Sequence, residues 1–262
     1  MIPDADTLGA PVPLRVGSWR GARDERVAAE LVAAALAGRE EKEAHALKSD
    51  HRSSVVAVPT RAYPVVIKQV RKAGARRRLA DSLRGSPARR AWTAGRRLIR
   101  SGIGAALPLA FLEQRTLGTP TRSLLVSLDL RQVPTAAERL ADPTQREATL
   151  GVLSDLLVKL HRSGAIHGDL RAQHVHLDTR PRLIDLESVR FRARLSDDQR
   201  IEDLAQFNAS IADALASGAE RRTAFERYAS TLPFRAATPD VLEQIARRSV
   251  ARGHLYRGSA TC

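Results

Sequence analysis

The chain has 262 residues, of which 43% are hydrophobic and only 4% aromatic, so it has enough apolar residues for one or two folded domains with an aliphatic core. Its single cysteine, Cys262, excludes an intrachain disulfide framework and a cysteine metal site. The formal net charge is +14, from 43 Lys plus Arg against 29 Asp plus Glu. This charge favours anionic partners such as nucleic acid, anionic lipid or a phosphorylated glycolipid.

No segment of the sequence indicates passage through a membrane. Residues 1–6 are acidic and lack the apolar core of a signal peptide. The longest apolar stretch, residues 27–37, is interrupted by Glu30 and is too short to span a bilayer. We therefore expect a cytoplasmic protein, whose positive charge is compatible with peripheral contact with an anionic membrane surface.

The first part of the chain predicts one helix and several strands. Residues 25–36 place Val27, Leu31 and Ala34 on one face and predict a helix, which ends at the polar residues 40–43. Residues 65–70 are rich in β-branched side chains and give the clearest strand of this half, with Lys68 within it. Shorter strands are expected at 14–16, 46–48 and 54–58, with a polar loop at 49–53 and a turn at 59–62.

A strongly basic segment and a helix follow. Residues 71–84 include the arginine cluster 76–78. Ser86 has the character of an N-cap and Pro87 that of a first helical residue, so we predict a helix over 86–100 that closes at the following serine and glycine. Two further strands are expected at 107–111 and 123–128.

The remainder of the chain is mainly helical. The helix expected at 148–163 leads directly into the polar loop 166–177, and a short apolar strand, 183–187, follows that loop. Further helices are expected at 201–215, 219–228 and 239–251. We predict an α+β, two-lobed fold, with a small β-rich N-terminal lobe at 1–128 and a mainly helical C-terminal lobe at 129–262.

Three side chains follow one another along the sequence in the order in which kinases carry the residues for phosphoryl transfer. Lys68 lies inside an apolar strand, where a lysine calls for an anionic partner, and it is assigned to the α- and β-phosphates of ATP. Asp169 in the loop would orient an acceptor hydroxyl and accept its proton, and Asp185 would bind the metal ion that bridges the phosphates. Arg171 would neutralise the transferring phosphate, and His167 would brace the loop.

The position five residues after Asp169 is His174, where most kinases carry asparagine. A chain with His167, Asp169 and His174 in one loop, followed by an Ile-Asp-Leu strand at 184–186, resembles the lipopolysaccharide kinase family, whose bacterial members phosphorylate Kdo or heptose in the lipopolysaccharide inner core. The resemblance implies a protein-kinase-like fold over roughly residues 45–215. Softer matches lie at 47–49, 86–92, 101–110 and 200–204.

The resemblance also implies a set of ligands and supporting residues. ATP and Mg²⁺ are the expected cofactors, and Asp203 would buttress the catalytic loop. Magnesium prefers oxygen ligands, and His174 offers only nitrogen. Glu187 would therefore supply an oxygen ligand to the metal. If His174 binds the metal, Mn²⁺ should support activity comparatively well. The acceptor would be a glycolipid or sugar at the inner face of the bacterial inner membrane.

The sequence departs from the usual kinase pattern in three places. Residues 48–56 contain no glycine, so the backbone at Ser49 and Ser54 would approach the phosphates in place of a glycine-rich loop. The helix 86–100 contains no acidic residue, and Ala91 stands where many relatives carry glutamate. Asp185 is followed by Leu-Glu and not by Phe-Gly.

These departures leave alternatives open. The short segment between Asp185 and Asp203 offers little scaffold for an extended peptide, so a sugar or another small acceptor is favoured over a protein. One alternative is a kinase-fold pseudoenzyme that only binds, and another is an antibiotic-type small-molecule kinase, a group that normally keeps asparagine at the position of His174. Nucleic acid is suggested by charge alone, and the scarcity of aromatic residues removes the stacking platform that single strands need.

Overall fold

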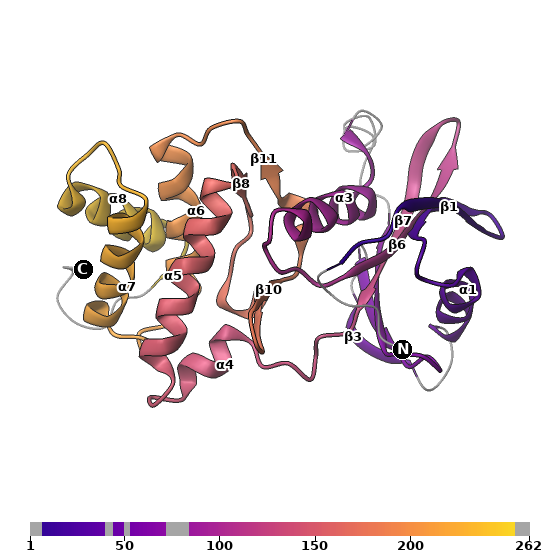
Figure 1. The fold of residues 1–262 in the computed structure, drawn as a ribbon, viewed down its shortest axis with the longest axis horizontal. Helices are drawn as coiled ribbons and strands as arrows, with labels where there is room; N and C mark the ends of the chain where they lie inside the picture. Colours follow the sequence, from indigo (N-terminus) through magenta and orange to yellow (C-terminus); the bar gives the residue numbers. More distant parts are fainter. Residues whose placement is uncertain (1–6, 40–43, 50–52, 72–83, 255–262) are drawn as a thin grey trace. The chain divides into compact units, whose positions relative to one another are not determined.

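The computed structural model describes residues 7–39, 44–49, 53–71 and 84–254. Two of the segments discussed above, 40–43 and the arginine cluster 76–78, lie outside these ranges, as does most of the loop 49–53. The chain forms two compact units, Met1–Gln132 and Val133–Cys262 (Figure 1). Each unit has its own buried core, and each is described by itself below.

The first unit is built on one antiparallel sheet whose strand order, among the described residues, is β1-β2-β6-β7-β5-β4-β3. The predicted strands at 54–58 and 65–70 are confirmed as β4 and β5. The strands of the sheet are β1 (Pro11–Val16), β2 (Trp19–Asp24), β3 (His45–Ser49), β4 (Ser53–Val58), β5 (Val65–Arg71), β6 (Pro108–Thr116) and β7 (Thr119–Leu128).

Two features of this sheet differ from expectation. Strand β2 was not predicted, because its residues after Trp19 are polar or small and show no apolar alternation; pairing with β1 and β6 on either side forms it. Strands β6 and β7 extend well past the predicted 107–111 and 123–128 and meet at Leu117 and Gly118. Both turn residues have positive φ, 50° and 75°, which suits the twist of a two-residue hairpin.

The helix predicted at 86–100 is present as α3 (Pro87–Arg100), and it packs on the sheet of this unit (Figure 1). The Ser86 hydroxyl accepts a hydrogen bond from the amide of Arg89 at 3.2 Å, which caps the first turn. Trp92 packs against Phe111 of β6 with ring centroids 5.1 Å apart. Burying such side chains stabilises the unit by roughly 1.5–3 kcal/mol each.

Helix α1 of the same unit starts later than predicted. Helix α1 spans Ala29–Gly38 and not 25–36. The reason is Asp24, whose backbone carbonyl accepts from the amide of Val27 and whose side chain accepts from the amide of Arg26. These bonds fold the residues after β2 into a turn, so the helix begins only after it.

The second unit is a helical bundle that carries two short two-stranded sheets, the hairpin β9–β10 and the pair β8–β11. Helix α5 packs against α7, and α6 packs against α8. Short α4 was not predicted, and α6 was expected at 201–215. It begins earlier because Ser196 and Gln199 form a capping box, and it ends at Ala209. The elements are α4 (Ala136–Ala141), α5 (Arg146–Arg162), β8 (Ala165–Ile166), β9 (Val175–Leu177), β10 (Pro181–Leu183), β11 (Arg190–Phe191), α6 (Asp197–Ala209), α7 (Gly218–Thr231) and α8 (Thr238–Ala251).

Helices of the described ranges are all too short or too polar to cross a bilayer.

Candidate functional site

The loop between β8 and β9 is held by one buried carboxylate. Asp203 of α6 is 1% exposed. Its two side-chain oxygens accept the backbone amides of His167, at 3.1 Å, and Gly168, at 3.0 Å. Burial alone would raise the pKa of Asp203, but the hydrogen bond from His161 and those from the two amides outweigh it and lower the pKa. Asp203 is therefore an anion that fixes the backbone just before Asp169.

A chain of buried hydrogen bonds supports this carboxylate from behind. Arg200 Nε donates to the Tyr228 hydroxyl at 2.8 Å, so that hydroxyl donates to His161 Nδ1, also at 2.8 Å. His161 Nε2, 3.3 Å from Asp203 Oδ2, then carries the proton and donates to the carboxylate. Burial raises the pKa of Tyr228 to about 12, so its hydroxyl stays a donor at neutral pH. The network links α5, α6 and α7 to the loop.

The backbone at Gly168 needs a glycine. Its φ is +75°, a left-handed conformation that other residues adopt at a cost, and an added Cβ would lie 3.0 Å from the carbonyl oxygen of Ser188. The chain turns sharply here, and the next side chain is that of Asp169. The loop position of Asp169 is thus set by Gly168 and by the Asp203 clamp together.

The side chain of Asp169 is oriented by two donors. Gln206 Nε2 donates to Asp169 Oδ1 at 3.0 Å, and Arg171 Nε donates to the same oxygen at 3.2 Å. Gln206 was not expected from the sequence; the only signal was its place three residues after Asp203, on the same face of α6. Arg171 is half-exposed, so its side chain is available to an anion as well as to Asp169.

His174 joins this loop to the segment that carries Asp185; the strand expected at 183–187 is not formed there, because β10 ends at Leu183 and a 3-10 turn follows Asp185. Its Nδ1 lies 2.7 Å from the backbone oxygen of Asp169, which can only accept, so Nδ1 carries the proton. Its other ring nitrogen, Nε2, faces Asp185 and lies 3.6 Å from Asp185 Oδ2. The amide of Ile184 donates to the His174 carbonyl at 3.0 Å, and this bond aligns the two segments. Asp185 itself has φ of +61°, a left-handed conformation.

Asp169, His174 and Asp185 together form a group that can hold a metal ion. One ligand atom from each lies within 4.8 Å of the others, and all three side chains are half-buried. Two carboxylate oxygens and one imidazole nitrogen are a ligand set that a divalent cation can use, with the remaining positions open to water or phosphate oxygens. Asp169 thus joins this group, although the sequence had assigned the metal to Asp185, His174 and Glu187. Glu187 lies in the short 3-10 turn after Asp185 and is outside the group.

His167 braces the loop from its buried side. It is fully buried, its Nε2 donates to the carbonyl of Ile184 at 3.0 Å, and its ring lies against that of His174 with centroids 6.2 Å apart. Burial lowers the pKa of His167 despite the nearby Asp203 charge, so the ring is neutral. A neutral, buried ring without access to solvent supports the loop and is no candidate for proton transfer.

The three residues assigned to ATP phosphates lie in the first unit. Lys68 of β5 is half-buried and stands in one row of directly paired residues with Val55 of β4 and Leu125 of β7. Leu125 is paired in turn with Phe111, which Trp92 of α3 covers, so Lys68 is on the α3 side of the sheet. Ser49 of β3 and Ser54 of β4 are opposite each other in the register. That these three residues and Asp169 meet around one ATP molecule remains a prediction.

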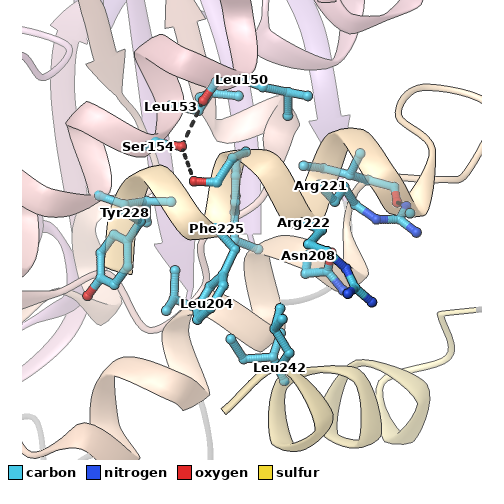
Figure 2. Close-up of a pocket in the computed structure, with 16 residues that line it drawn as sticks. Leu150, Leu153, Ser154, Leu204, Asn208, Arg221, Arg222, Phe225, Tyr228 and Leu242 are labelled. Atoms are coloured by element: carbon cyan, nitrogen blue, oxygen red, sulfur yellow. Dashed lines mark hydrogen bonds between the residues drawn. The ribbon is translucent and has the colours of Figure 1, made fainter. Parts of the chain in front are cut away.

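A separate apolar cavity of about 70 Å³ lies among the helices α5, α6, α7 and α8 (Figure 2). Figure 2 shows Leu150, Leu153, Phe225 and Tyr228 around it, with the Ser154 hydroxyl turned to backbone oxygens of its own and the neighbouring helix. None of the metal-binding group lines it. It carries no cluster of titratable side chains that could perform chemistry, so the polar group on the loop is the candidate active site.

Comparison with known proteins agrees with this geometry. The sequence model of the lipopolysaccharide kinase (Kdo/WaaP) family matches residues 52–228, which is more than half of the chain. A solved structure described as WaaP in complex with acyl carrier protein is similar at a TM-score of 0.60 and 17% identity, covering 80% of this chain and 88% of that one. No curated protein sequence matches the chain. The predicted family and the predicted α+β kinase-like fold are both confirmed.

Proposed function

Because the chain belongs to the lipopolysaccharide kinase family, we propose that it transfers the γ-phosphate of ATP to a sugar hydroxyl, Kdo or heptose, of the lipopolysaccharide inner core. Family membership makes it a kinase of the lipopolysaccharide core in general. The observation that carries the finer proposal is the convergence of Asp169, His174 and Asp185 within 4.8 Å, on a loop fixed by the buried Asp203.

Asp169 is the group proposed to accept the proton. Both hydrogen bonds to its side chain from described residues end on Oδ1, so Oδ2 faces no competing donor among them. The acceptor oxygen attacks the γ-phosphorus, the bond from that phosphorus to the β,γ-bridging oxygen breaks, and ADP leaves. The hydroxyl proton passes to Oδ2, and Gln206 keeps the carboxylate turned toward the acceptor.

Asp185 and His174 are proposed to hold the divalent ion, Mg²⁺ or Mn²⁺, which when bound neutralises phosphate charge. Lys68 and the backbone at Ser49 and Ser54 are proposed to bind the phosphates from the first unit. Arg171 reaches Asp169 and is half-exposed, so we assign it to the transferring phosphate. Glu187 is proposed as a further oxygen ligand of the ion, as expected from the sequence, although it lies outside the group of three.

The acceptor class follows from the family and from the charge. A core sugar is carried on a lipid, so the enzyme would work as a peripheral protein at the cytoplasmic face of the inner membrane, where a net charge of +14 favours contact with anionic lipid. Nucleic acid is not a proposed partner.

The test is transfer of labelled γ-phosphate to Kdo-lipid A, heptosylated lipid A, an aminoglycoside and a mixed protein substrate, each with Mg²⁺ and with Mn²⁺. We expect label in one of the two lipid A acceptors. Incorporation only into protein or only into the aminoglycoside would contradict the sugar assignment, and no ATP consumption with any acceptor would favour a binding module.

The catalytic assignment is tested by Asp169→Asn, which keeps the shape of the side chain and removes its basicity. Loss of general-base catalysis should reduce kcat by a factor of about 10²–10⁴. The matched control is Asp178→Asn, an exposed aspartate of the same unit whose partners among the described residues are Arg182, Thr179 and the neighbouring backbone. Equal activity of the two variants would remove Asp169 from the mechanism.

A further inference from the structure

A second cavity lies in the first unit, where the strands β1, β2 and β6 are neighbours in the sheet. Unlike the apolar cavity of the helical unit, it is lined mainly by charged and polar residues. Its volume is about 800 Å³, large enough for a phosphorylated group with its first hydration shell. The proposed kinase function assigns nothing to it. Its lining contains four arginines, one glutamate and one serine, namely Arg15, Arg20, Arg89, Arg115, Glu113 and Ser18, with Gly21 and Phe111.

The strand register concentrates like charges in this cavity. Arg15 of β1 is paired directly with Arg20 of β2, and Arg20 is paired directly with Glu113 of β6. Directly opposed side chains of an antiparallel pair have Cβ atoms roughly 5 Å apart, and like charges at that distance repel each other. Like charges directly opposite each other destabilise the pair, and an anion bound between the two arginines would remove this repulsion.

The single carboxylate of the cavity is already engaged. Glu113 is 5% exposed, and its Oε2 accepts from Arg115 Nε at 2.8 Å. Glu113 Oε1 is buried and has no hydrogen-bond partner among the described residues. One carboxylate cannot balance four guanidinium groups, so the cavity keeps an excess of positive charge.

The remaining arginines are free to reach a ligand. Arg15 donates only to a backbone oxygen at 3.4 Å, and within the described ranges the side chains of Arg20 and Arg89 make no hydrogen bond or ion pair. Arg89 comes from the first turn of α3, so it approaches from a different element than the two strand arginines. Guanidinium groups from three elements around one hollow can offer paired N–H donors to a tetrahedral oxyanion.

We propose that this cavity is a binding site for a phosphomonoester, held by Arg15, Arg20 and Arg89. A monoester carries close to two negative charges at neutral pH and so compensates the excess better than a singly charged diester. The group can come from a lipid headgroup or from a soluble phosphate. Binding uses only the first unit and does not require phosphoryl transfer, so this proposal stands apart from the kinase mechanism.

The experiment measures binding of two probes to the full-length protein without ATP. Inorganic phosphate is titrated by calorimetry, and vesicles of phosphatidylcholine with or without phosphatidic acid are tested by cosedimentation. The variant Arg20→Gln/Arg89→Gln is compared with the charge-matched control Arg100→Gln/Arg222→Gln, whose arginines are exposed and lie outside the cavity. Removing a charge-assisted contact should weaken binding about tenfold, so the cavity variant should lose roughly a hundredfold and the control less than threefold.

Each outcome has a defined meaning. Binding of phosphate alone, or of phosphatidic acid vesicles alone, supports the site and identifies its source. Equal losses in the two double variants mean that general surface charge attracts the probes, and they overturn the proposal, as does failure of both probes to bind. The single variants Arg20→Gln and Arg89→Gln, each expected to lose about tenfold, decide the question if the double variant does not fold. Asp169→Asn should bind like the wild type, which separates this test from that of the kinase.

Discussion

Among the described residues, each of the two units has one fully buried aspartate that accepts hydrogen bonds from several donors, and the two aspartates hold different parts of the structure. Asp24 in the first unit is 0% exposed and accepts the amide of Gly9 at 2.9 Å, Arg96 Nη1 at 2.9 Å and Arg26 Nε at 2.9 Å. Asp203 in the second unit accepts two backbone amides and His161. The first carboxylate is paired with two arginines, and the second is held by two backbone amides and a histidine.

The partners of the two aspartates explain the difference. Arg96 belongs to α3, so Asp24 ties that helix to the end of β2 and to the segment around Gly9, and Arg96 also lies over the Trp92 ring at 4.7 Å. A carboxylate from β2 thus stabilises the helix that carries no acidic residue of its own. Asp203 holds a loop whose next residue is Asp169. We infer that Asp24 serves mainly stability, whereas Asp203 serves mainly activity.

The largest effect should come from breaking the ion pair of the first unit. Arg96→Met leaves a buried carboxylate short of a cation, and the free energy of unfolding should fall by about 3–5 kcal/mol. The double variant Asp24→Leu/Arg96→Met should recover part of that loss. Urea denaturation measures both, with Arg227→Met of the exposed pair with Asp155 as control, expected to cost at most about 1 kcal/mol. If the free energy of unfolding falls as little as in the control, the buried pair of Asp24 and Arg96 stabilises the protein no more than an exposed ion pair does.

A smaller and different effect is expected for Asp203→Asn. The amide has one acceptor oxygen, so its NH₂ group faces one of the two backbone N–H groups and that donor loses its partner. We expect kcat to fall about a hundredfold through displacement of the loop, with about 1–3 kcal/mol lost from stability. Asp24→Asn, the matched change in the other unit, should leave kcat within about threefold while the protein is folded. Comparable kcat losses in both variants would contradict the division of roles.

A still smaller effect should follow from Gln206→Ala, which removes one donor from Asp169 Oδ1 without disturbing the Asp203 clamp. We expect kcat to fall about tenfold with KM nearly unchanged, because one neutral hydrogen bond orients the carboxylate. The matched control is Gln173→Ala, which changes an exposed glutamine of the loop that carries Asp169. If KM rises and kcat stays constant, Gln206 acts in binding and does not orient Asp169.

The smallest effect is the pH dependence of stability. The ordinary pKa of both aspartates is 3.8, and in the folded protein the pKa of each is lower, because donors outweigh the burial that would raise it. The unfolded chain therefore binds protons first as the pH falls. The stabilisation that the two charged carboxylates provide is complete above about pH 4. It is lost as the pH falls through their pKa values in the folded protein. Denaturation midpoints between neutral pH and pH 3 should fall less steeply for Asp24→Asn than for the wild type; identical slopes would show that Asp24 has no lowered pKa.

The sequence predicted those parts of the molecule in which the signal is local. The β-branched run of β5, the Ser86 cap of α3 and the amphipathic spacing of α5 each lie within one segment, and each predicted element is present. The compact order of His167, Asp169 and His174 pointed to the loop for the same reason. Strand β2 had no such local signal, since its pairing with β1 and β6 forms it.

The remaining features depend on contacts between distant residues. The pairing of Asp24 with Arg96 joins a strand end to a helix, and nothing near either residue indicates the other. The hydrogen bond of Gln206 to Asp169 and the facing arginines of β1 and β2 likewise follow from helix orientation and strand register. Register was the missing quantity, because a shift by one residue would turn these side chains to the opposite face.

The left-handed backbone at Asp185 limits which residues that position can hold. Only glycine, asparagine, aspartate and, less readily, histidine adopt such a φ without a substantial penalty. A longer acid, glutamate, would keep the negative charge, but its left-handed backbone conformation would destabilise the protein by roughly 1–2 kcal/mol. Chemistry and chain geometry therefore restrict the same position independently. Asparagine is the replacement that separates the two demands, because it accepts the turn and lacks the anion, and it is the change by which metal affinity can be altered while the fold is preserved.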